Sequence, residues 1–294
     1  MHPVGLRPGA VTVQGVRSPT LEAGPPNERE AVVFLHGNPG SSGDWRGLLR
    51  ATGAFARSVA LDLPGFGRAD KREDFDYTIE GYVRHVEGAL TALGIERCHL
   101  VLHDFGAMFG LGYAFRHPDR VRSLVLLNVG VLRGYRWHTA ARVWRIPVLG
   151  ELAMALTTGP AFRLALRRGN PRPLPATFVD EMWRHFDRGT RRAVLRLYRS
   201  TDPRELRSLV DAAVETFRER NWPALVIWGK HDPFLSWRYA ARQREAFPSA
   251  EVHVLAESGH WPYADQPRTV ESLVERFLRP LIESRAVATP MPRP

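Results

Sequence analysis

Short apolar runs alternate with amphipathic stretches along most of the chain, and each run ends in glycine, proline or polar residues. Uninterrupted apolar runs of this length are typical of strands buried on both faces. They cover residues 31–35, 58–62, 99–102, 124–127, 224–228 and 251–255. One more strand-like run, at residues 10–14, lies in an N-terminal segment rich in proline and glycine. The pattern predicts a largely parallel sheet.

Helical periodicity separates these runs. Between residues 78 and 93, apolar side chains recur at spacings of three and four, and Gly94 follows where a helix C-cap belongs. Similar patterns predict helices at residues 105–117 and 269–281. Strands that alternate with helices predict an α/β protein whose sheet is covered by helices on both faces. We expect the tail from Ala286 to Pro294 to be frayed.

The alternation is interrupted between residues 131 and 220. This interval is helical in pattern, rich in tryptophan, arginine and leucine, and broken by proline and glycine at residues 147–150 and 169–173. We expect it to form an inserted helical cap, with residues 1–130 and 221–294 forming the core. A chain of 294 residues suits one large α/β domain with such an insertion.

The composition sets limits on the kind of protein. A hydrophobic fraction of 44% with 24% charged residues is ordinary for a globular chain. No apolar run approaches the roughly 18–20 residues that cross a bilayer, and the N-terminus lacks a signal-peptide pattern. The single cysteine, Cys98, excludes an intramolecular disulfide and a cysteine-rich metal site. We therefore expect a cytoplasmic protein with no membrane partner, metal or other cofactor.

The charge is strongly basic and unevenly spread. The formal net charge is +10, and residues 131–220 contain 18 arginines against 9 acidic residues. A basic segment of this kind can bind nucleic acid or an anionic ligand. No zinc-finger, RNA-binding or helix-turn-helix signature accompanies it, so we expect solvated arginine-rich helix faces and no nucleic-acid partner. A weaker hypothesis is that these arginines select an acidic aromatic substrate.

Four of the predicted strands end in clusters that can carry chemistry: HGNPG at residues 36–40, LHDFG at 102–106, WGKHDP at 228–233 and ESGHWP at 257–262. The carboxyl ends of parallel strands meet at one edge of a sheet, so these clusters should lie together. The second has the strand–turn–helix form of a nucleophile elbow, with Asp104 in the nucleophile's place. Asp232 and His260 follow in the order nucleophile, acid, histidine.

An aspartate nucleophile restricts the chemistry. A serine that attacks saturated carbon forms an ether, whereas a carboxylate forms an ester that water can cleave. Asp104 therefore suits an epoxide carbon or a carbon that bears a halide. His260, oriented by Asp232, would activate the water. The backbone N–H groups of Asn38 and Phe105 would form the oxyanion hole.

From about residue 31 to 281 the sequence resembles the α/β-hydrolase superfamily, in the branch that holds haloalkane dehalogenases and epoxide hydrolases. The resemblance is densest at residues 36–42, 62–67, 101–106 and 258–261. It implies the α/β-hydrolase fold with a helical cap. Some relatives take the catalytic acid from the position of Asn128, which cannot carry a charge here, so we expect Asp232 to fill that role.

The resemblance leaves two activities open. Asn38 and the serines after it are similar to the halide site of many dehalogenases, but those enzymes pair the asparagine with a tryptophan after the nucleophile. Phe105 has no side-chain N–H to offer. Epoxide hydrolases typically donate protons from two cap tyrosines, and Tyr198 with either Tyr135 or Trp137 would supply them.

The missing halide donor favours an epoxide hydrolase that acts on a small hydrophobic or aromatic molecule. A haloalkane dehalogenase that uses the same covalent mechanism is the alternative. A non-hydrolytic, receptor-like member of the fold is the third possibility, although a binding module has no need of the complete set of Asp104, Asp232 and His260. The sequence does not indicate an oligomeric state.

Overall fold

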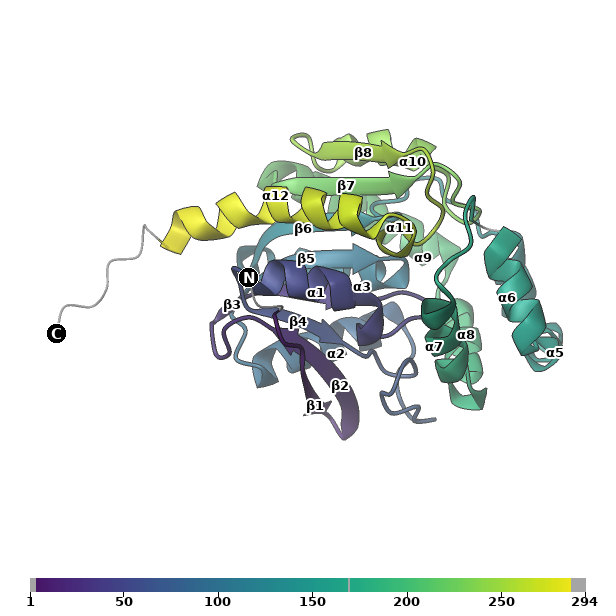
Figure 1. The fold of residues 1–294 in the computed structure, drawn as a ribbon. Helices are drawn as coiled ribbons and strands as arrows, with labels where there is room; N and C mark the ends of the chain where they lie inside the picture. Colours follow the sequence, from purple (N-terminus) through teal and green to yellow (C-terminus); the bar gives the residue numbers. More distant parts are fainter. Residues whose placement is uncertain (1–3, 169, 287–294) are drawn as a thin grey trace.

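A computed structural model describes residues 4–168 and 170–286 of the chain. Within these residues, eight strands form one sheet in the order β1-β2-β4-β3-β5-β6-β7-β8 (Figure 1). The strands are β1 (Arg7–Val13), β2 (Val16–Ala23), β3 (Glu30–Leu35), β4 (Ser58–Leu61), β5 (Arg97–His103), β6 (Val121–Leu127), β7 (Ala224–Gly229) and β8 (Glu251–Leu255). Strands β3 to β8 pair in parallel, while β1 with β2 and β2 with β4 are antiparallel.

The strand order reverses at β3, which is flanked by β4 on one side and β5 on the other. In open α/β sheets, ligands bind beyond the carboxyl ends of the strands at such a switch point. Residues 36–40 follow β3, and Asp104 follows β5. The topology therefore brings two of the predicted clusters side by side.

Helices cover both faces of the sheet (Figure 1). The helices α1 and α12 pack together on one face, and α2 and α3 pack together on the other. The helical elements outside the interval between β6 and β7 are η1 (Ser42–Trp45), α1 (Arg46–Gly53), α2 (Ile79–Ala92), α3 (Phe105–Arg116), η2 (Pro118–Arg120), α10 (Arg238–Arg242), η3 (Gln243–Glu245), α11 (Pro262–Asp265) and α12 (Pro267–Ala286).

Helix α2 shows how local signals set these boundaries. The Thr78 side chain accepts a hydrogen bond from the backbone N–H of Gly81 and so caps the N-terminus. Gly94 follows the last turn with φ of 66°, the left-handed conformation that glycine adopts without strain. The predicted helix from 78 to 93 is confirmed to within one residue at each end.

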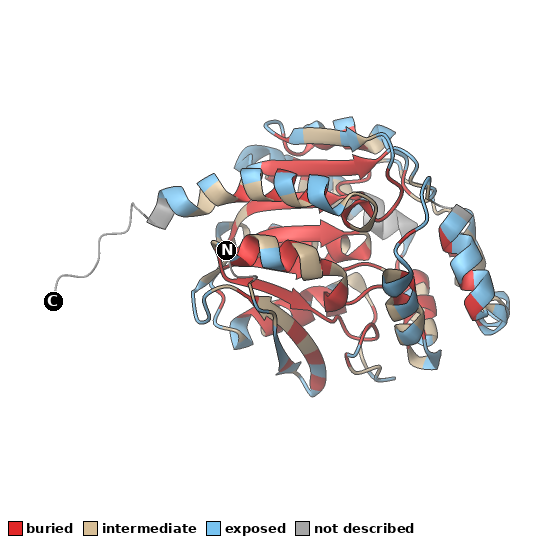
Figure 2. Cartoon of the chain, viewed as in Figure 1, coloured by how far each residue is buried: buried red, intermediate tan, exposed pale blue. Residues whose placement is uncertain are grey.

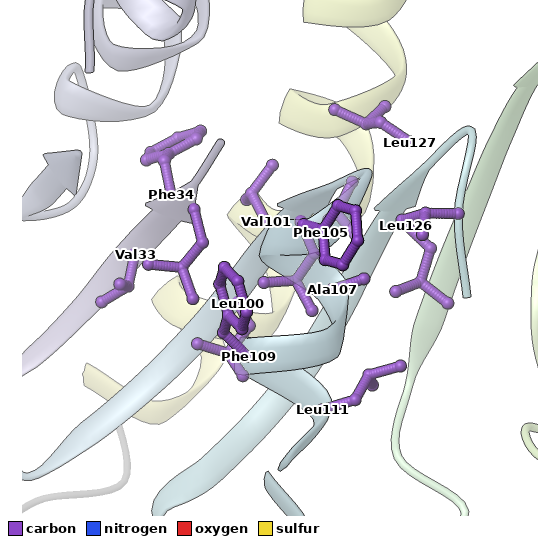
Figure 3. Packing of buried hydrophobic residues seen from close by; sticks show 14 of the residues in the cluster. Val33, Phe34, Leu100, Val101, Phe105, Ala107, Phe109, Leu111, Leu126 and Leu127 are labelled. Atoms are coloured by element: carbon purple, nitrogen blue, oxygen red, sulfur yellow. The ribbon is translucent and has the colours of Figure 1, made fainter. Parts of the chain in front are cut away.

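The core lies along the central strands. Strand β7 is buried throughout, and β3 and β5 are buried except at their first residue. Figure 2 shows these strands as a buried layer between half-exposed helices. Figure 3 shows how Phe105 and Phe109 of α3 lie over apolar side chains such as Val101 and Leu126 from β5 and β6. This packing holds α3, and with it the elbow at Asp104, rigidly against the sheet.

Two strand predictions need correction. The segment before residue 30 holds two strands, β1 and β2, where the sequence pattern indicates one run at residues 10–14. β8 is an edge strand with exposed and half-exposed positions rather than a buried one. Edge strands need only one apolar face, so a short apolar run does not establish burial on both faces. The tail expected to be frayed lies outside the described residues beyond Ala286.

Within the described residues, six helices stand between β6 and β7, and we call them the inter-strand helices. They are α4 (Thr139–Arg145), α5 (Leu149–Leu156), α6 (Gly159–Arg168), α7 (Ala176–His185), α8 (Arg188–Ser200) and α9 (Pro203–Arg220). An ion pair attaches α7 to the rest of the chain: Arg46 binds Glu181 through both guanidinium nitrogens, at 2.6 and 2.9 Å. Such a two-point contact also fixes orientation.

The arginines of this interval mostly meet carboxylates and backbone carbonyls. Arg163 pairs with Asp180, and Arg199 pairs with Glu151. Arg191 donates to the backbone carbonyls of residues 154 and 157. The basic character of residues 131–220 therefore reflects exposed helix faces and helix-end contacts, as the composition suggests.

Candidate active site

Asp104 stands on a sharp turn between β5 and α3. Its backbone has φ of 48° and ψ of −129°, a conformation that costs a non-glycine residue about 1–3 kcal/mol. The turn also requires Gly106, because a Cβ atom there would lie 2.2 Å from the carbonyl oxygen of Leu35. Strain of this kind persists only where the surrounding structure enforces it, and it exposes the Asp104 side chain at the end of the sheet.

Two backbone N–H groups bind the Asp104 carboxylate. The Asn38 N–H donates to Oδ1 over 2.8 Å, and the backbone of Phe105 hydrogen-bonds the same carboxylate. The approach is close: a Cβ atom on Gly37 would lie 2.2 Å from the Cβ of Asp104. The two groups predicted to form the oxyanion hole therefore both contact Asp104.

His36 fixes the loop that presents Asn38. Its Nε2 accepts a hydrogen bond from the backbone N–H of Leu63 over 3.0 Å, so the ring proton is on Nδ1, which donates to the carbonyl of Gly37 over 2.8 Å. Burial lowers the pKa of His36, in keeping with this neutral tautomer. The histidine of the HGNPG motif is thus a structural link between two loops.

Asp232 and His260 meet beyond the ends of β7 and β8. His260 Nδ1 lies 2.8 Å from Asp232 Oδ2. The other oxygen of Asp232 accepts from the backbone N–H groups of Phe234 and Leu235, at 2.8 and 2.9 Å. Asn128 donates to Oδ2 over 2.6 Å. With His260, four described groups therefore donate to this carboxylate. It is not free to act as a nucleophile, and its role is to orient the imidazole.

The second ring nitrogen of His260 faces Asp104. Nε2 lies 3.7 Å from Asp104 Oδ2, the oxygen that the Asn38 N–H does not hold. Burial acts to lower the pKa of His260, but the charge of Asp232, its hydrogen bond and the charge of Asp104 outweigh this and raise it. Burial also raises the pKa of Asp104, against the charge of His260 and the two backbone N–H groups. The structure thus brings Asp104, Asp232 and His260 together.

A small cavity of about 30 Å³ lies over Asp104. That volume is enough for one or two water molecules. All three predicted proton donors line it, and the full lining comprises Asp104, Phe105, Met108, Val129, Leu132, Tyr135, Trp137, His138, Tyr198, Phe234 and Leu235. None of the described residues that line this cavity is an arginine or a lysine, so the lining itself offers no cation for an acidic substrate.

The three predicted donors differ in their partners. The Tyr135 hydroxyl is hydrogen-bonded by the backbone of His138. The Trp137 Nε1–H is buried without an acceptor among the described residues. Tyr198 is buried, and burial raises its pKa well above the usual value, so its phenol is neutral.

Two donors approach the Tyr198 oxygen. His138 caps α4 by accepting the Ala141 N–H at Nδ1, over 3.2 Å, so its proton is on Nε2, which lies 3.5 Å from the Tyr198 oxygen. Burial lowers the pKa of His138 to about 4 and keeps it neutral. The Asn38 side chain also hydrogen-bonds the phenol, and its Oδ1 has no partner among the residues that the structure describes, which identifies its N–H as the donor. The Tyr198 hydrogen therefore remains available to a ligand.

Two residues of the site were not predicted in these roles. His138 lies next to Trp137, and the pattern of this segment does not show which ring faces Asp104. The signal for the role of His138 is its place directly before a helix, where it is the N-cap of α4. Asn128 is predicted to be unable to act as the acid, and the structure adds that it holds Asp232 in place. A buried amide at the carboxyl end of β6 was the signal for that role.

Two general features complete the description. No group of three or more histidine, cysteine or acidic side chains within residues 4–168 and 170–286 is arranged to hold a metal ion. Among the helices that the structure describes, none combines the length and apolar character that a membrane span requires.

The fold and the site define a class of protein. Residues 30–267 match the profile of the α/β hydrolase fold, so the chain belongs to that family. Its similarity to haloalkane dehalogenases supports the dehalogenase-like branch, whose members have an aspartate nucleophile. The protein is therefore a hydrolase of the α/β fold.

Individual relatives are similar to different extents. A haloalkane dehalogenase of Agrobacterium fabrum is 41% identical over 124 residues, which cover 42% of this chain and 40% of the relative. A cis-3-alkyl-4-alkyloxetan-2-one decarboxylase of Shewanella oneidensis is 28% identical over 271 residues, or 88% of this chain and 84% of the relative. The crystal structure of a haloalkane dehalogenase from Agrobacterium tumefaciens superposes with a TM-score of 0.81 at 28% identity, over 94% of this chain and 97% of that one.

Proposed function

We propose that the protein opens an epoxide to a diol through a covalent ester on Asp104. The observation that carries this proposal is the Tyr198 phenol, which lines the cavity over Asp104 and has a free hydrogen. An epoxide oxygen stays attached to its product and accepts a proton as the ring opens, so it needs an O–H donor at this place. The neutral phenol of Tyr198 meets that need.

In the first step Asp104 Oδ2 attacks an epoxide carbon, and the carbon–oxygen bond of the ring breaks. The ring oxygen takes the proton of Tyr198, which gives a hydroxyalkyl ester. Oδ1 becomes the ester carbonyl oxygen and keeps its hydrogen bond from the backbone of Asn38, while the backbone of Phe105 also donates to the carboxylate. Oδ2 is the nucleophile because Oδ1 is already held and Oδ2 faces the histidine.

In the second step His260 Nε2 takes a proton from water, and the resulting hydroxide attacks the ester carbon of Asp104. The negative charge that develops on Oδ1 meets the two backbone N–H groups, a contact worth about 3–4 kcal/mol in comparable sites. The diol leaves as Asp104 is restored, and the proton on His260 returns through solvent to Tyr198. Asp232 stabilises the imidazolium during this step. We also propose that residues 131–220 act as a cap that supplies Tyr198, Trp137 and Tyr135 to the cavity.

A second candidate is haloalkane dehalogenation by the same ester chemistry. One observation favours it: the Trp137 Nε1–H is buried without an acceptor among the described residues and belongs to a side chain that lines the cavity. A departing halide needs N–H donors of this kind, and several of the similar solved structures are haloalkane dehalogenases. Phe105, which offers no side-chain N–H, weighs against it.

The substrate in the name of the decarboxylase relatives is an oxetan-2-one, a four-membered ring with an oxygen. Such a strained ring could also meet a carboxylate and an O–H donor. A screen should therefore offer terminal epoxides, bromoalkanes and dialkyl oxetanones together, and should score diol, bromide and carbon dioxide. The proposal expects diol to form fastest. Bromide release without diol formation would replace the proposal with haloalkane dehalogenation, and carbon dioxide release without diol formation would replace it with decarboxylation of an oxetanone.

A further inference from the structure

A second, larger cavity of about 360 Å³ lies beside the catalytic one. Its lining comes from α2, α3, the segment after β6 and α9, and we call it the side chamber. The lining residues that carry the argument are Met108, Leu111, Leu132, Tyr135, Ala213 and Phe217. The remaining lining comprises Ile79, Glu80, Val83, Gly112, Phe115, Arg116, Gly130, Val131 and Val210. A cavity of this volume falls in the range of about 300–1,000 Å³ that small-molecule sites occupy.

The side chamber and the catalytic cavity share a wall. Met108, Leu132 and Tyr135 line both of them. The catalytic cavity by itself holds about 30 Å³, too little for a substrate larger than the reacting group. A ligand that places its reactive carbon at Asp104 therefore needs further room, and the side chamber is the adjoining space.

The outer end of the side chamber is polar. Glu80 and Arg116 line it and form an ion pair, with Nη2 of Arg116 2.5 Å from Oε2 of Glu80. Both side chains are at least a third exposed, so the pair marks the solvent side. Among the described lining residues, the charged side chains are thus those at the mouth, and the other side chains are apolar apart from the Tyr135 hydroxyl, which suits a chain without polar groups.

We propose that the side chamber binds an unbranched apolar arm, an alkyl chain, of the substrate whose reactive carbon sits at Asp104. This assignment rests on the proposed function. The arm passes the shared wall at Met108, an unbranched side chain with three rotatable bonds that can move aside at low cost. The chamber then sets the preferred chain length of the substrate.

The test fills the chamber. Ala213 of α9 lines it, whereas its neighbour Ala212 is exposed and does not. Ala213→Phe should occupy the space that the arm needs, and Ala212→Phe is the matched control on the same helix. Val210→Phe, one turn earlier in the same lining, guards against a folding defect specific to position 213. Thermal unfolding of each variant reports on its integrity.

Turnover of propene, hexene and decene oxides measures the effect. In the unmodified protein, kcat/KM should rise by up to about fourfold for each methylene that the chamber buries. In Ala213→Phe and Val210→Phe that rise should be lost, so decene oxide falls by about tenfold or more, while propene oxide and the Ala212→Phe control change by less than about twofold. An unchanged chain-length profile in both folded chamber variants would overturn the proposal.

Binding of decanol, followed by calorimetry, separates this proposal from the reaction. Weaker decanol binding in Ala213→Phe but not in Ala212→Phe supports alkyl binding in the side chamber, even if the protein turns over no epoxide. In that case the proposed epoxide hydrolysis would be wrong and the alkyl-binding role of the chamber would stand. Equal decanol binding in all three proteins overturns the chamber whatever the screen of substrates shows.

Discussion

Asn128 and Asp232 leave the sheet from adjacent strands and meet at 2.6 Å between Nδ2 and Oδ2. Asn128 also accepts the Gly229 N–H at Oδ1 over 2.8 Å and donates to the Gly259 carbonyl over 3.0 Å. One buried amide therefore ties together the loops that carry Asp232 and His260. It holds Asp232 Oδ2 from one side while His260 Nδ1 approaches from the other.

This relationship predicts that Asn128→Ala lowers kcat by about 10–100-fold, the value of one hydrogen bond to a charged group. KM should change little, because Asn128 does not line the cavity. Steady-state kinetics and thermal unfolding of the same preparation measure both effects. A folded variant with unchanged kcat would show that Asp232 needs no support from Asn128.

Tyr198→Phe should lower diol formation from an epoxide by about 10²–10³-fold, because the opening ring loses its proton donor. The ring remains, so packing against Phe105 and Trp137 is kept. Tyr135→Phe is the comparison variant, because the Tyr135 hydroxyl lines the same cavity and accepts a hydrogen bond from the backbone of His138. A larger loss in Tyr135→Phe than in Tyr198→Phe would assign the donor to Tyr135 instead.

The pH dependence of ester hydrolysis should follow His260. The base must be neutral to accept a proton, so the rate falls as the pH drops below its pKa, which is raised above the reference of about 6.5. Asp232→Asn removes the charge that raises this pKa. The acidic limb should then move to lower pH, even as the rate falls by up to about 10⁴-fold.

Single-turnover hydrolysis of the preformed ester, measured across a range of pH values, gives the acidic limb of the unmodified protein and that of Asp232→Asn. A limb that stays in place or moves to higher pH in Asp232→Asn would mean that Asp232 does not set the pKa of His260.

Asp44 predicts a pH effect on stability away from the reaction. Burial raises its pKa from 3.8 to about 8, and the charges of Asp62 and Glu181 add to the rise. The folded state therefore keeps a proton that the unfolded chain releases, and stability falls as the pH rises from about 4 to about 8, by at most about 1.4 kcal/mol per pH unit. Asp44→Asn removes this loss, so its advantage in Tm over the unmodified protein should grow across that window.

Asp74→Asn is the control for this measurement, because Asp74 is exposed and its pKa is lowered by its hydrogen bond with Arg72. Its effect on Tm should be small throughout the window. An Asp44→Asn variant whose Tm difference is flat with pH would show that Asp44 is ionised in the folded protein.

The sequence predicts those parts of the molecule that depend on local pattern and on sheet geometry. Asp104, Asp232 and His260 each follow a predicted strand, and parallel strands end at one edge, so their meeting could be expected. β2 could not, because two of its buried positions, Ser18 and Thr20, are polar, and its pairing with β1 and β4 depends on residues distant in the sequence.

The sequence indicates Tyr135 and Trp137 as candidate donors, but it does not predict the role of His138 or which of these side chains has a free N–H or O–H. These residues precede α4, and their side-chain directions depend on how the inter-strand helices pack on the sheet rather than on local periodicity. The side chamber could not be predicted for the same reason, since it forms between α9 and two helices, α2 and α3, that lie far from α9 in the sequence.

Intact-mass spectrometry of His260→Gln after exposure to an epoxide tests the central claim most directly. The ester should form and not be hydrolysed, so the protein should gain the full mass of the epoxide, and peptide mapping should place the adduct on Asp104. A haloalkane would add only its alkyl group in place of a proton. His260→Gln protein that consumes the epoxide without any adduct, or that carries the adduct on another residue, would contradict the account.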